Sequence, residues 1–284
     1  MPRWMVKALA VTPGLVISTV VTSMVGATLP ALAGAILFVG GLAVGVLLGA
    51  GAGESAAARV LLASRPARAE ELDMLAGALT VLCRAQLGPP LIRLRVRPGE
   101  HAVAAGGFGR RTVVVSAGLL DAVERGHLSQ DQAAAVIAHA AALARGGWVR
   151  NDPVIGFWSL PWQIIAAVAQ VVASVGRRLP LTSLVWRLRG IVIAIAVVQS
   201  VQLRQFWLAA TIAGIGIVSY AMPALERRWR QVLLDSGDVA VREAGLAPPL
   251  AAFLRRCPRT PSRQARLRTL EGSTQVLRPL GLVR

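Results

Sequence analysis

The sequence predicts an α+β protein of the membrane, in which several membrane-spanning helices carry a mainly helical domain with a small β-sheet. Composition, long apolar blocks and two short strand-like segments predict this class. Hydrophobic residues make up 55% of the 284 residues and charged residues only 16%, whereas soluble domains carry about 25% charged residues. The composition therefore excludes an ordinary soluble enzyme and a disordered chain.

Residues 1–52 are predicted to form a hairpin of two transmembrane helices. The apolar blocks at 8–26 and 31–52 each supply the roughly 20 residues that a span needs. Arg3 and Lys7 precede the first block as in a cleavable signal peptide, but the block is longer than a signal core of roughly 7–15 residues. We therefore expect a hairpin, and cleavage is the alternative.

The rest of the chain alternates between water-compatible and apolar segments. Residues 53–152 and 226–284 are polar, and both carry more arginines than acidic residues. If these two segments fold together, residues 153–225 cross the membrane an even number of times. We expect a transmembrane pair there, joined by a basic connector that contains Arg177, Arg178, Arg187 and Arg189.

Short elements can be predicted within 53–152. Residues 91–96 alternate apolar side chains with arginines, and 112–116 are β-branched, so both are predicted strands. The glycine-rich segment 105–110 between them is predicted to be a turn. Ser129 with Gln132 forms a capping box, which predicts a helix from there to about Arg145.

Charge and cysteine content restrict the partners and the chemistry. The net charge is +17, and we explain it by basic residues on the cytoplasmic side of the membrane. Membrane lipid is therefore the expected partner, and no nucleic-acid partner is expected. The C-terminal arginines from Arg255 to Arg268 are expected to be a solvated helix face near anionic lipid. Cys83 and Cys257 are too few for a disulfide framework.

Several segments occur in a recognisable order. These are His-Ala-Val-Ala at 101–104, Val-Val-Val-Ser-Ala-Gly-Leu-Leu at 113–120, Leu-Ser-Gln-Asp-Gln at 128–132, Gly-Asp-Val-Ala at 237–240 and Cys-Pro-Arg-Thr-Pro-Ser-Arg at 257–263. The set resembles the HtpX-like and CAAX-prenyl-protease-like membrane zinc metallopeptidases. The resemblance implies a zincin-like (gluzincin) domain built from 53–152 and 226–284.

The resemblance also implies a degenerate metal site. The family motif is His-Glu-x-x-His on a helix, where the histidines bind zinc and the Glu activates water. Here His139 keeps the first ligand position, but Ala140 stands at the general base and Leu143 at the second ligand. Leu234 stands at the third ligand, and Asp238 is expected to orient His139 by a hydrogen bond. No metal, cofactor or catalytic residue is expected.

The function that the resemblance implies is a membrane-anchored pseudopeptidase, a binding or regulatory protein without peptidase activity. A protein or peptide partner is expected at an edge strand formed by Thr112, Val113, Val114, Val115 and Ser116. The domain is expected on the cytoplasmic side of the plasma (inner) membrane. An active zinc endopeptidase with substitute ligands and a structural membrane component are the alternatives.

Overall fold

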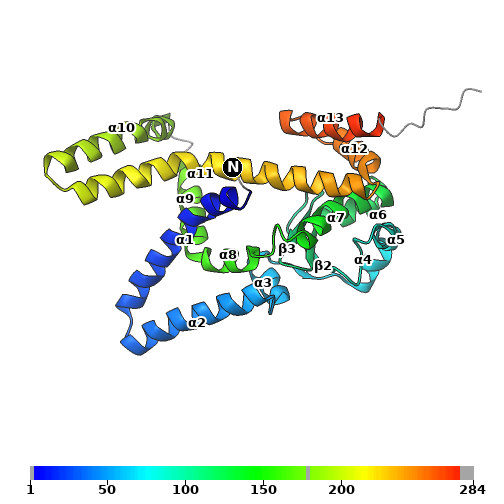
Figure 1. Ribbon diagram of the computed structural model, residues 1–284, viewed down its shortest axis with the longest axis horizontal. Coiled ribbons are helices and arrows are strands. Elements are labelled where there is room, and N and C mark those ends of the chain that lie inside the picture. The colour runs from blue at the N-terminus through cyan, green and yellow to red at the C-terminus, as the bar shows by residue number, and fades with distance from the viewer. Residues whose placement is uncertain (1–2, 177–179, 276–284) are drawn as a thin grey trace, which may run out of the picture. The chain divides into compact units, whose positions relative to one another are not determined.

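The computed structural model describes residues 3–176 and 180–275 (Figure 1). The helices are α1 (Arg3–Thr28), α2 (Ala31–Ala50), α3 (Glu54–Leu61), α4 (Ala69–Met74), α5 (Ala76–Arg84), α6 (Ala117–Glu124), α7 (Gln130–Arg145), α8 (Asp152–Trp158), α9 (Leu160–Gly176), α10 (Pro180–Gln202), α11 (Phe206–Glu243), α12 (Ala247–Arg256) and α13 (Pro261–Gln275). The strands are β1 (Arg65–Pro66), β2 (Arg93–Arg97), β3 (Ala105–Phe108) and β4 (Thr112–Ser116). The protein is therefore mainly helical with one small sheet.

The chain folds into two compact units. The helical unit comprises Met1–Gly41 and Trp158–Gln231, and the sheet unit comprises Leu42–Phe157 and Val232–Arg284. Two polar stretches of sequence thus belong to one unit, although residues 158–231 separate them along the chain.

Close contacts of α1 with Trp158, the last residue of α8, and with α9 organise the helical unit. The indole Nε1 of Trp158 donates to the Thr19 hydroxyl at 2.9 Å, and the Trp162 amide donates to the Ser18 hydroxyl at 3.1 Å. A Cβ at Gly14 would lie 3.1 Å from the Trp162 ring, so a small residue permits this approach. Polar side chains thus pair between helices and leave apolar side chains on the outside.

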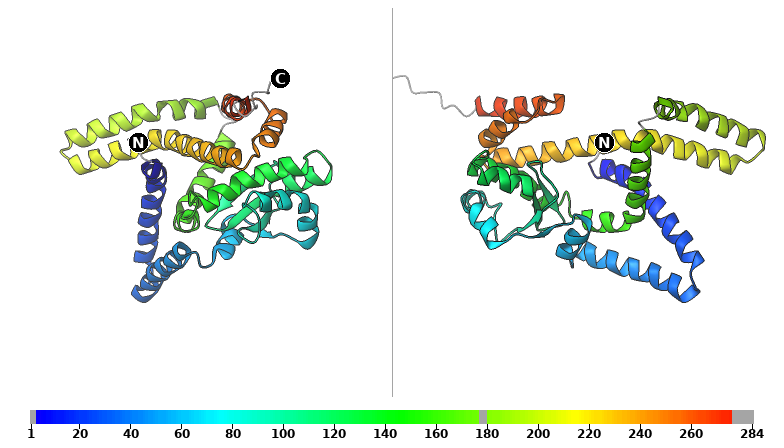
Figure 2. Two further views of the ribbon diagram at one scale, coloured as in Figure 1. Left: turned by 45° about the vertical axis from the view of Figure 1, so that its right-hand side comes forward. Right: turned by 180° about the vertical axis from the view of Figure 1, so that it is seen from behind.

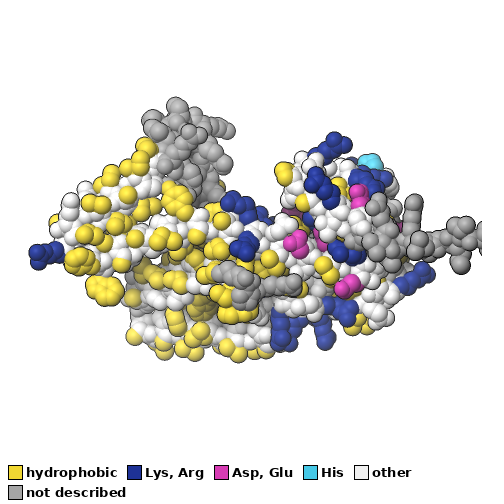
Figure 3. Space-filling model, turned by 45° about the horizontal axis from the view of Figure 1, so that its top comes forward, with side chains coloured by type: hydrophobic (Ala, Val, Ile, Leu, Met, Phe, Trp, Pro, Cys, Tyr) yellow, Lys and Arg dark blue, Asp and Glu magenta, His cyan; other side chains and the backbone are white. Residues whose placement is uncertain are grey.

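The outer surface of these helices is apolar. Trp207 is 89% exposed and Leu32 75% exposed, and apolar side chains cover much of the helical unit on the face that Figure 3 shows. Such an extended apolar surface is unfavourable in water. By length and composition, Trp4–Thr28, Ala31–Ala50 and Phe206–Glu243 can each cross a membrane.

The apolar stretches after residue 152 differ in detail from the expectation. The segment 153–176 is divided between α8 and α9 at Ser159, and the segment 190–223 is divided by a turn at 203–205. Arg204 lies in that turn between two helices, exposed and with a φ of 59°. In the predicted connector, Arg177 and Arg178 lie outside the described residues.

A four-stranded mixed sheet with the strand order β1-β2-β4-β3 forms the centre of the sheet unit. β4 runs parallel to β2 and antiparallel to β3, with Val96 opposite Val115 and Gly106 opposite Val114. Helix α7 packs along β3 and β4 (Figure 2). All five residues of β4 are buried, which explains its run of β-branched side chains.

Helix α7 begins where the predicted capping box at Ser129 and Gln132 places it. The Ser129 hydroxyl accepts from the Gln132 amide at 3.3 Å, and the Gln132 side chain accepts from the Ser129 amide at 3.2 Å. This reciprocal capping box satisfies two amides that would otherwise lack partners at the start of the helix. Gly147, with a φ of 73°, follows the helix end.

The glycine-rich segment after residue 104 is a strand, and the prediction of a turn over 105–110 was wrong. Ala105–Phe108 pairs with β4, and the turn begins only at Gly109, which has a φ of 71°. A Cβ at Gly107 would lie 2.6 Å from the carbonyl oxygen of Ala140 on α7. Gly107 is therefore required for close packing of strand against helix rather than for a turn.

Candidate functional site

The candidate site is built around His139, which α7 holds against α11. The side chain of His139 is only 13% exposed. Its Nε2 lies 3.3 Å from the carbonyl oxygen of Leu234 and 3.5 Å from Oδ1 of Asp238. Both neighbours are acceptors, so this arrangement requires a hydrogen on Nε2. The nitrogen then acts as a donor rather than as a metal ligand.

Helix α11 approaches the His139 ring at Gly237. A Cβ on this glycine would lie 2.3 Å from Nε2 and 2.5 Å from Cδ2 and Cε1. Any other residue would force the ring or the helix to move. The imidazole therefore fills the space that a side chain at position 237 would occupy.

Asp238 is held by Arg266, one of the arginines of the predicted solvated helix face. Nε and Nη2 of Arg266, on α13, donate to the two carboxylate oxygens of Asp238 at 2.7 and 2.6 Å. The two side chains are 12% and 5% exposed. Asp238 was expected to hydrogen-bond His139, and its Oδ1 does lie 3.5 Å from Nε2, but the hydrogen bond of the imidazole is to the Leu234 carbonyl and those of the carboxylate are to Arg266. For Arg266, the expectation of a solvated position was wrong.

The electrostatics favour a neutral imidazole. Burial lowers the pKa of His139 below its usual range, the Asp238 carboxylate acts in the opposite direction, and the Arg266 guanidinium lowers the pKa further. Since Arg266 neutralises much of the carboxylate charge, burial decides the direction. A neutral His139 with its hydrogen on Nε2 agrees with the hydrogen bond to Leu234.

The remaining positions of the expected metal site carry no ligand atoms. Ala140 is fully buried, and its carbonyl faces Gly107 on β3. Leu143 clusters with Ala144, Val149 and the partly buried Trp148 and Leu233. Leu233 rather than Leu234 joins that cluster, and Leu234 supplies its carbonyl to His139.

These residues do not fit a zinc ion. Zinc sites use three or four ligands from Cys, His, Asp and Glu, and within 3–176 and 180–275 there is no group of three such residues that could hold a metal. The side chains that the resemblance places around a metal are one histidine, an alanine and two leucines.

The strand predicted as the edge of the sheet is in its interior. Thr112–Ser116 pairs with β2 on one side and β3 on the other, so it cannot accept a further strand. The expectation that Thr112–Ser116 forms an edge strand was therefore wrong, whereas the expectation of a peptide partner stays a prediction. Among the described strands, β3 lies at the end of the sheet beyond β4.

A groove lies beside β3. It has a volume of about 470 Å³ and is lined mainly by residues 104–108 and 114–116. Arg97, Glu100 and Asp152 add charge to an otherwise apolar lining. Gly106 is exposed, whereas Phe108 is buried. The part of β3 that is exposed beside the groove is therefore at Gly106, and Gly107 also lines the groove.

No protein-family model matches the chain, and no curated protein or solved structure is significantly similar to it.

Proposed function

We propose that this chain is a membrane-anchored binding protein without peptidase activity, which holds an extended peptide segment against β3. The observation that carries the proposal is the free edge of this strand beside the groove. The proposal keeps the function implied by the metallopeptidase resemblance and moves its binding strand from Thr112–Ser116 to Ala105–Phe108.

The hydrogen-bond pattern identifies the backbone groups that a peptide would contact. The carbonyl of Ala104 accepts from the Ser116 amide at 3.0 Å, so Ala104 directs its backbone towards β4. Along a strand of an antiparallel pair, residues whose backbone groups bond to the partner strand alternate with residues whose backbone groups point away from it. Ala105 and Gly107 therefore direct their N–H and C=O groups away from β4. No hydrogen bond that the structure records for the described residues engages the outward groups of Ala105 and Gly107, whereas the next outward amide, that of Gly109, donates to the Val149 carbonyl at 3.1 Å, so the free part of the edge is Ala105–Gly107.

Free edge groups are a template for strand addition. An extended peptide bonds to the edge through its main chain, and pockets beside the edge select its side chains. Here the groove offers mainly apolar walls, and its lining also includes Asp152 and the ion pair of Arg97 with Glu100. We expect a peptide with apolar side chains at alternate positions and no strict charge requirement.

A proline substitution tests the edge. Ala105→Pro removes an outward amide without removing a bond of the β3–β4 ladder, whereas Ala105→Ser keeps the amide. A displayed library of ten-residue linear peptides would be selected on the full chain in detergent, and affinities measured by fluorescence anisotropy. A carbonyl without its donor costs about 1–3 kcal/mol, so Ala105→Pro should weaken binding roughly 5- to 150-fold, with Ala105→Ser within twofold. Failure to enrich peptides, or equal affinity for both variants, would contradict the proposal and favour a purely structural component.

Metal content tests the competing zinc peptidase. Purified chain should contain no stoichiometric zinc, since Ala140, Leu143 and Leu234 supply no ligands. The triple substitution Ala140→Glu, Leu143→His and Leu234→Glu restores the ligand types of the family motif and should bind one zinc if the two helices are related as in that family. Zinc in the unmodified chain would establish the alternative instead.

We further propose that the sheet unit lies on the cytoplasmic side of the plasma (inner) membrane. Its polar segments are rich in arginine, and basic residues concentrate on that side. The only two cysteines, Cys83 and Cys257, both lie in this unit. Cys83 is exposed. A membrane-impermeant maleimide should label Cys83 in opened cells but not in intact cells, with Cys83→Ser as the control. Labelling of intact cells would reverse the orientation.

A further inference from the structure

A break between α8 and α9 lies level with the middle of α1. Ser159 separates the two helices. On either side of it, the indole of Trp158 donates to the Thr19 hydroxyl, and the amide of Trp162 donates to the Ser18 hydroxyl. The part of α1 that can cross a membrane has 25 residues, and Ser18 and Thr19 are close to its midpoint. The break therefore lies near the middle of the membrane that α1 crosses.

Helix α8 runs along the second half of α2. Near the start of α8, the Val154 side chain lies 3.6 Å from the position of a Cβ on Gly49, in the last turn of α2. At the end of α8, the Trp158 ring lies 3.5 Å from the corresponding position on Gly41. The centroid of this ring is 6.1 Å from that of Phe38, near the middle of α2. The chain therefore passes from the end of α2 to its middle as it follows α8.

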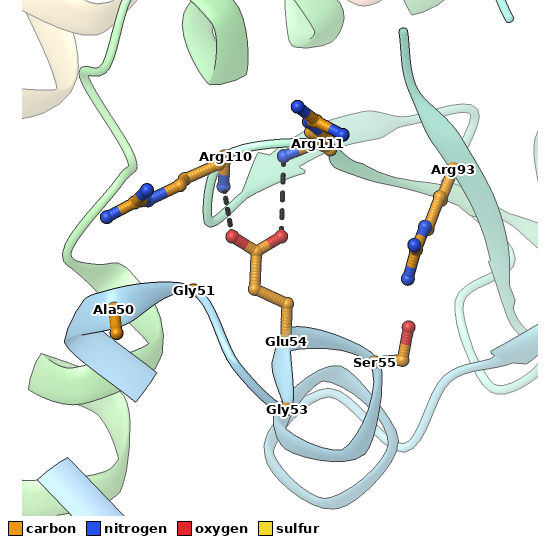
Figure 4. Close-up of a pocket in the computed structure, with 8 residues that line it drawn as sticks. All are labelled: Ala50, Gly51, Gly53, Glu54, Ser55, Arg93, Arg110 and Arg111. Carbon is orange, nitrogen blue, oxygen red and sulfur yellow. Dashed lines mark hydrogen bonds between the residues drawn. The ribbon is translucent and has the colours of Figure 1, made fainter. Parts of the chain in front are cut away.

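Charged groups gather where α2 ends. Nη2 of Arg110 donates to the Gly49 carbonyl at 3.0 Å. The carboxylate of Glu54, just beyond the helix, accepts from the amides of Arg110 at 2.7 Å and Arg111 at 3.3 Å (Figure 4). Charged groups are costly inside a membrane, so α2 ends at a membrane surface. We call this surface the near side, and α8 enters the membrane from it.

Helix α9 returns towards the near side. Since α1 and α2 are consecutive helices that can each cross a membrane, α1 begins on the side where α2 ends. The residues of α1 that are buried lie in its first part, at Val6, Ala10, Gly14 and Ser18, and none of residues 19–28 is buried. Because α9 packs along α1, it covers this first part. Figure 2 likewise shows α9 passing from α8 towards the end of α1 where the chain begins.

A side chain of α1 permits α9 to begin inside the membrane. The Trp162 amide lies in the first turn of α9, where amides lack partners within the helix. The fully buried Ser18 hydroxyl accepts from this amide at 3.1 Å, and within lipid every backbone polar group needs such a partner. With 17 residues, α9 is about 25 Å long. This length exceeds half of the roughly 30 Å hydrocarbon core, so α9 can reach the near side from the middle.

The outer face of α9 is apolar. The segment Leu160–Gly176 contains no charged residue. Four large apolar side chains of this helix are 43–64% exposed, namely Ile164, Ile165, Val168 and Val171. Their spacing places them on one face of the helix. Inside a membrane, such a face contacts acyl chains.

The helices that follow complete the path of the chain. Lys7, near the start of α1, has its Nζ 5.5 Å from the centroid of the Trp229 ring on α11, so the apolar part of α11 ends on the near side. Helix α11 therefore begins on the far side. Helix α10 has 23 residues, a length of about 35 Å, and carries the chain across. Arg187 and Arg189 then belong to the near side, and Arg204 to the far side.

We propose that α8 and α9 form a re-entrant element, which enters and leaves the membrane on the near side, and that the outer face of α9 contacts the acyl chains of the near leaflet only. The expected transmembrane pair within residues 153–225 is then α10 with the first part of α11. The basic connector lies on the same side as the arginine-rich polar segments, as the concentration of basic residues on one side of a membrane favours. This inference depends neither on the proposed peptide edge nor on which side is cytoplasmic.

Cysteine labelling tests the path of the chain. Cys83 alone, in a C257S chain, reports the side of the sheet unit. L188C in the connector and R204C in the turn before α11 would each be made in a C83S/C257S chain. With a membrane-impermeant maleimide, L188C should react from the same side as Cys83 and R204C from the opposite side. Reaction of L188C from the side opposite to Cys83, which a complete crossing by 153–176 requires, would overturn the proposal. Reaction of R204C from the side of Cys83, or of L188C only in detergent, would overturn it as well.

Spin labels test the lipid contact of α9. Val168 lies on its outer face, and Val39 is an exposed residue near the middle of α2. In vesicles of phosphatidylcholine and phosphatidylglycerol, a label on V168C should collide more often with oxygen than with a water-soluble nickel complex. The excess should be smaller than for V39C, because Val168 is nearer to the membrane surface.

Three results would contradict this contact. Low accessibility to both reagents would mean that protein, such as a second copy of the chain, covers α9. More frequent collisions with nickel would place the face in water. An excess of oxygen equal to that of V39C would place Val168 at the middle of the membrane and overturn the return to the near side.

Discussion

Replacing Gly237 by alanine should destabilise the sheet unit, although alanine is the better helix former. The added Cβ would lie 2.3 Å from Nε2 of His139, inside any van der Waals contact. Overpacking of a buried site costs about 1–3 kcal/mol, while Gly→Ala within a helix returns about 0.5–1 kcal/mol. The net loss should therefore be roughly 1–2 kcal/mol, or a 5- to 30-fold change in the unfolding equilibrium.

Hydrogen exchange measures this change locally. The slowest amides of α7 report the opening of the sheet unit, and mass spectrometry should find them exchanging roughly 5- to 30-fold faster in the Gly237→Ala chain. In a His139→Ala background the clash is absent. There the same substitution should slow exchange, since only the gain in helix propensity of about 0.5–1 kcal/mol remains.

A second helical glycine supplies the control. A Cβ at Gly272, on α13, would meet nothing within 4 Å, so Gly272→Ala should not accelerate exchange in α7. If Gly237→Ala behaves like Gly272→Ala in the unmodified chain, the imidazole does not occupy the space beside α11. The interpretation of His139 as a packed donor would then fail.

Two further predictions concern the buried charges. Because the pKa of His139 is lowered by burial, the unfolded chain binds more protons below the usual histidine pKa of about 6.5. Stability should thus be full above that pH and fall as the pH drops towards the folded pKa, and His139→Phe should reduce this fall in thermal unfolding scans. Asp238→Asn strands the buried guanidinium of Arg266 and should cost about 3–5 kcal/mol. Arg255→Gln, which breaks the exposed pair with Glu271, should cost less than about 1 kcal/mol. Similar losses for the two substitutions would contradict the buried pair.

Sequence alone predicted the elements that depend on local chemistry. The capping box at Ser129 and Gln132 placed α7, and the β-branched run placed β4. Apolar length placed α1 and α2. Each of these signals acts within a few residues or within one helix, so it can be read without knowing what packs against the element.

Tertiary structure alone decided which elements meet. β3 is a strand because Gly107 lets the backbone approach Ala140 on a helix that begins more than 20 residues later, and no local signal carries that information. The same holds for Asp238, whose partner is Arg266 on α13 rather than mainly the histidine that the motif spacing suggested. It also holds for β4, whose interior position depends on pairing with both β2 and β3. A buried polar group or a backbone group of a strand needs a hydrogen-bond partner. Which partner lies within reach depends on how distant segments of the chain pack together, so the sequence near the group does not determine it.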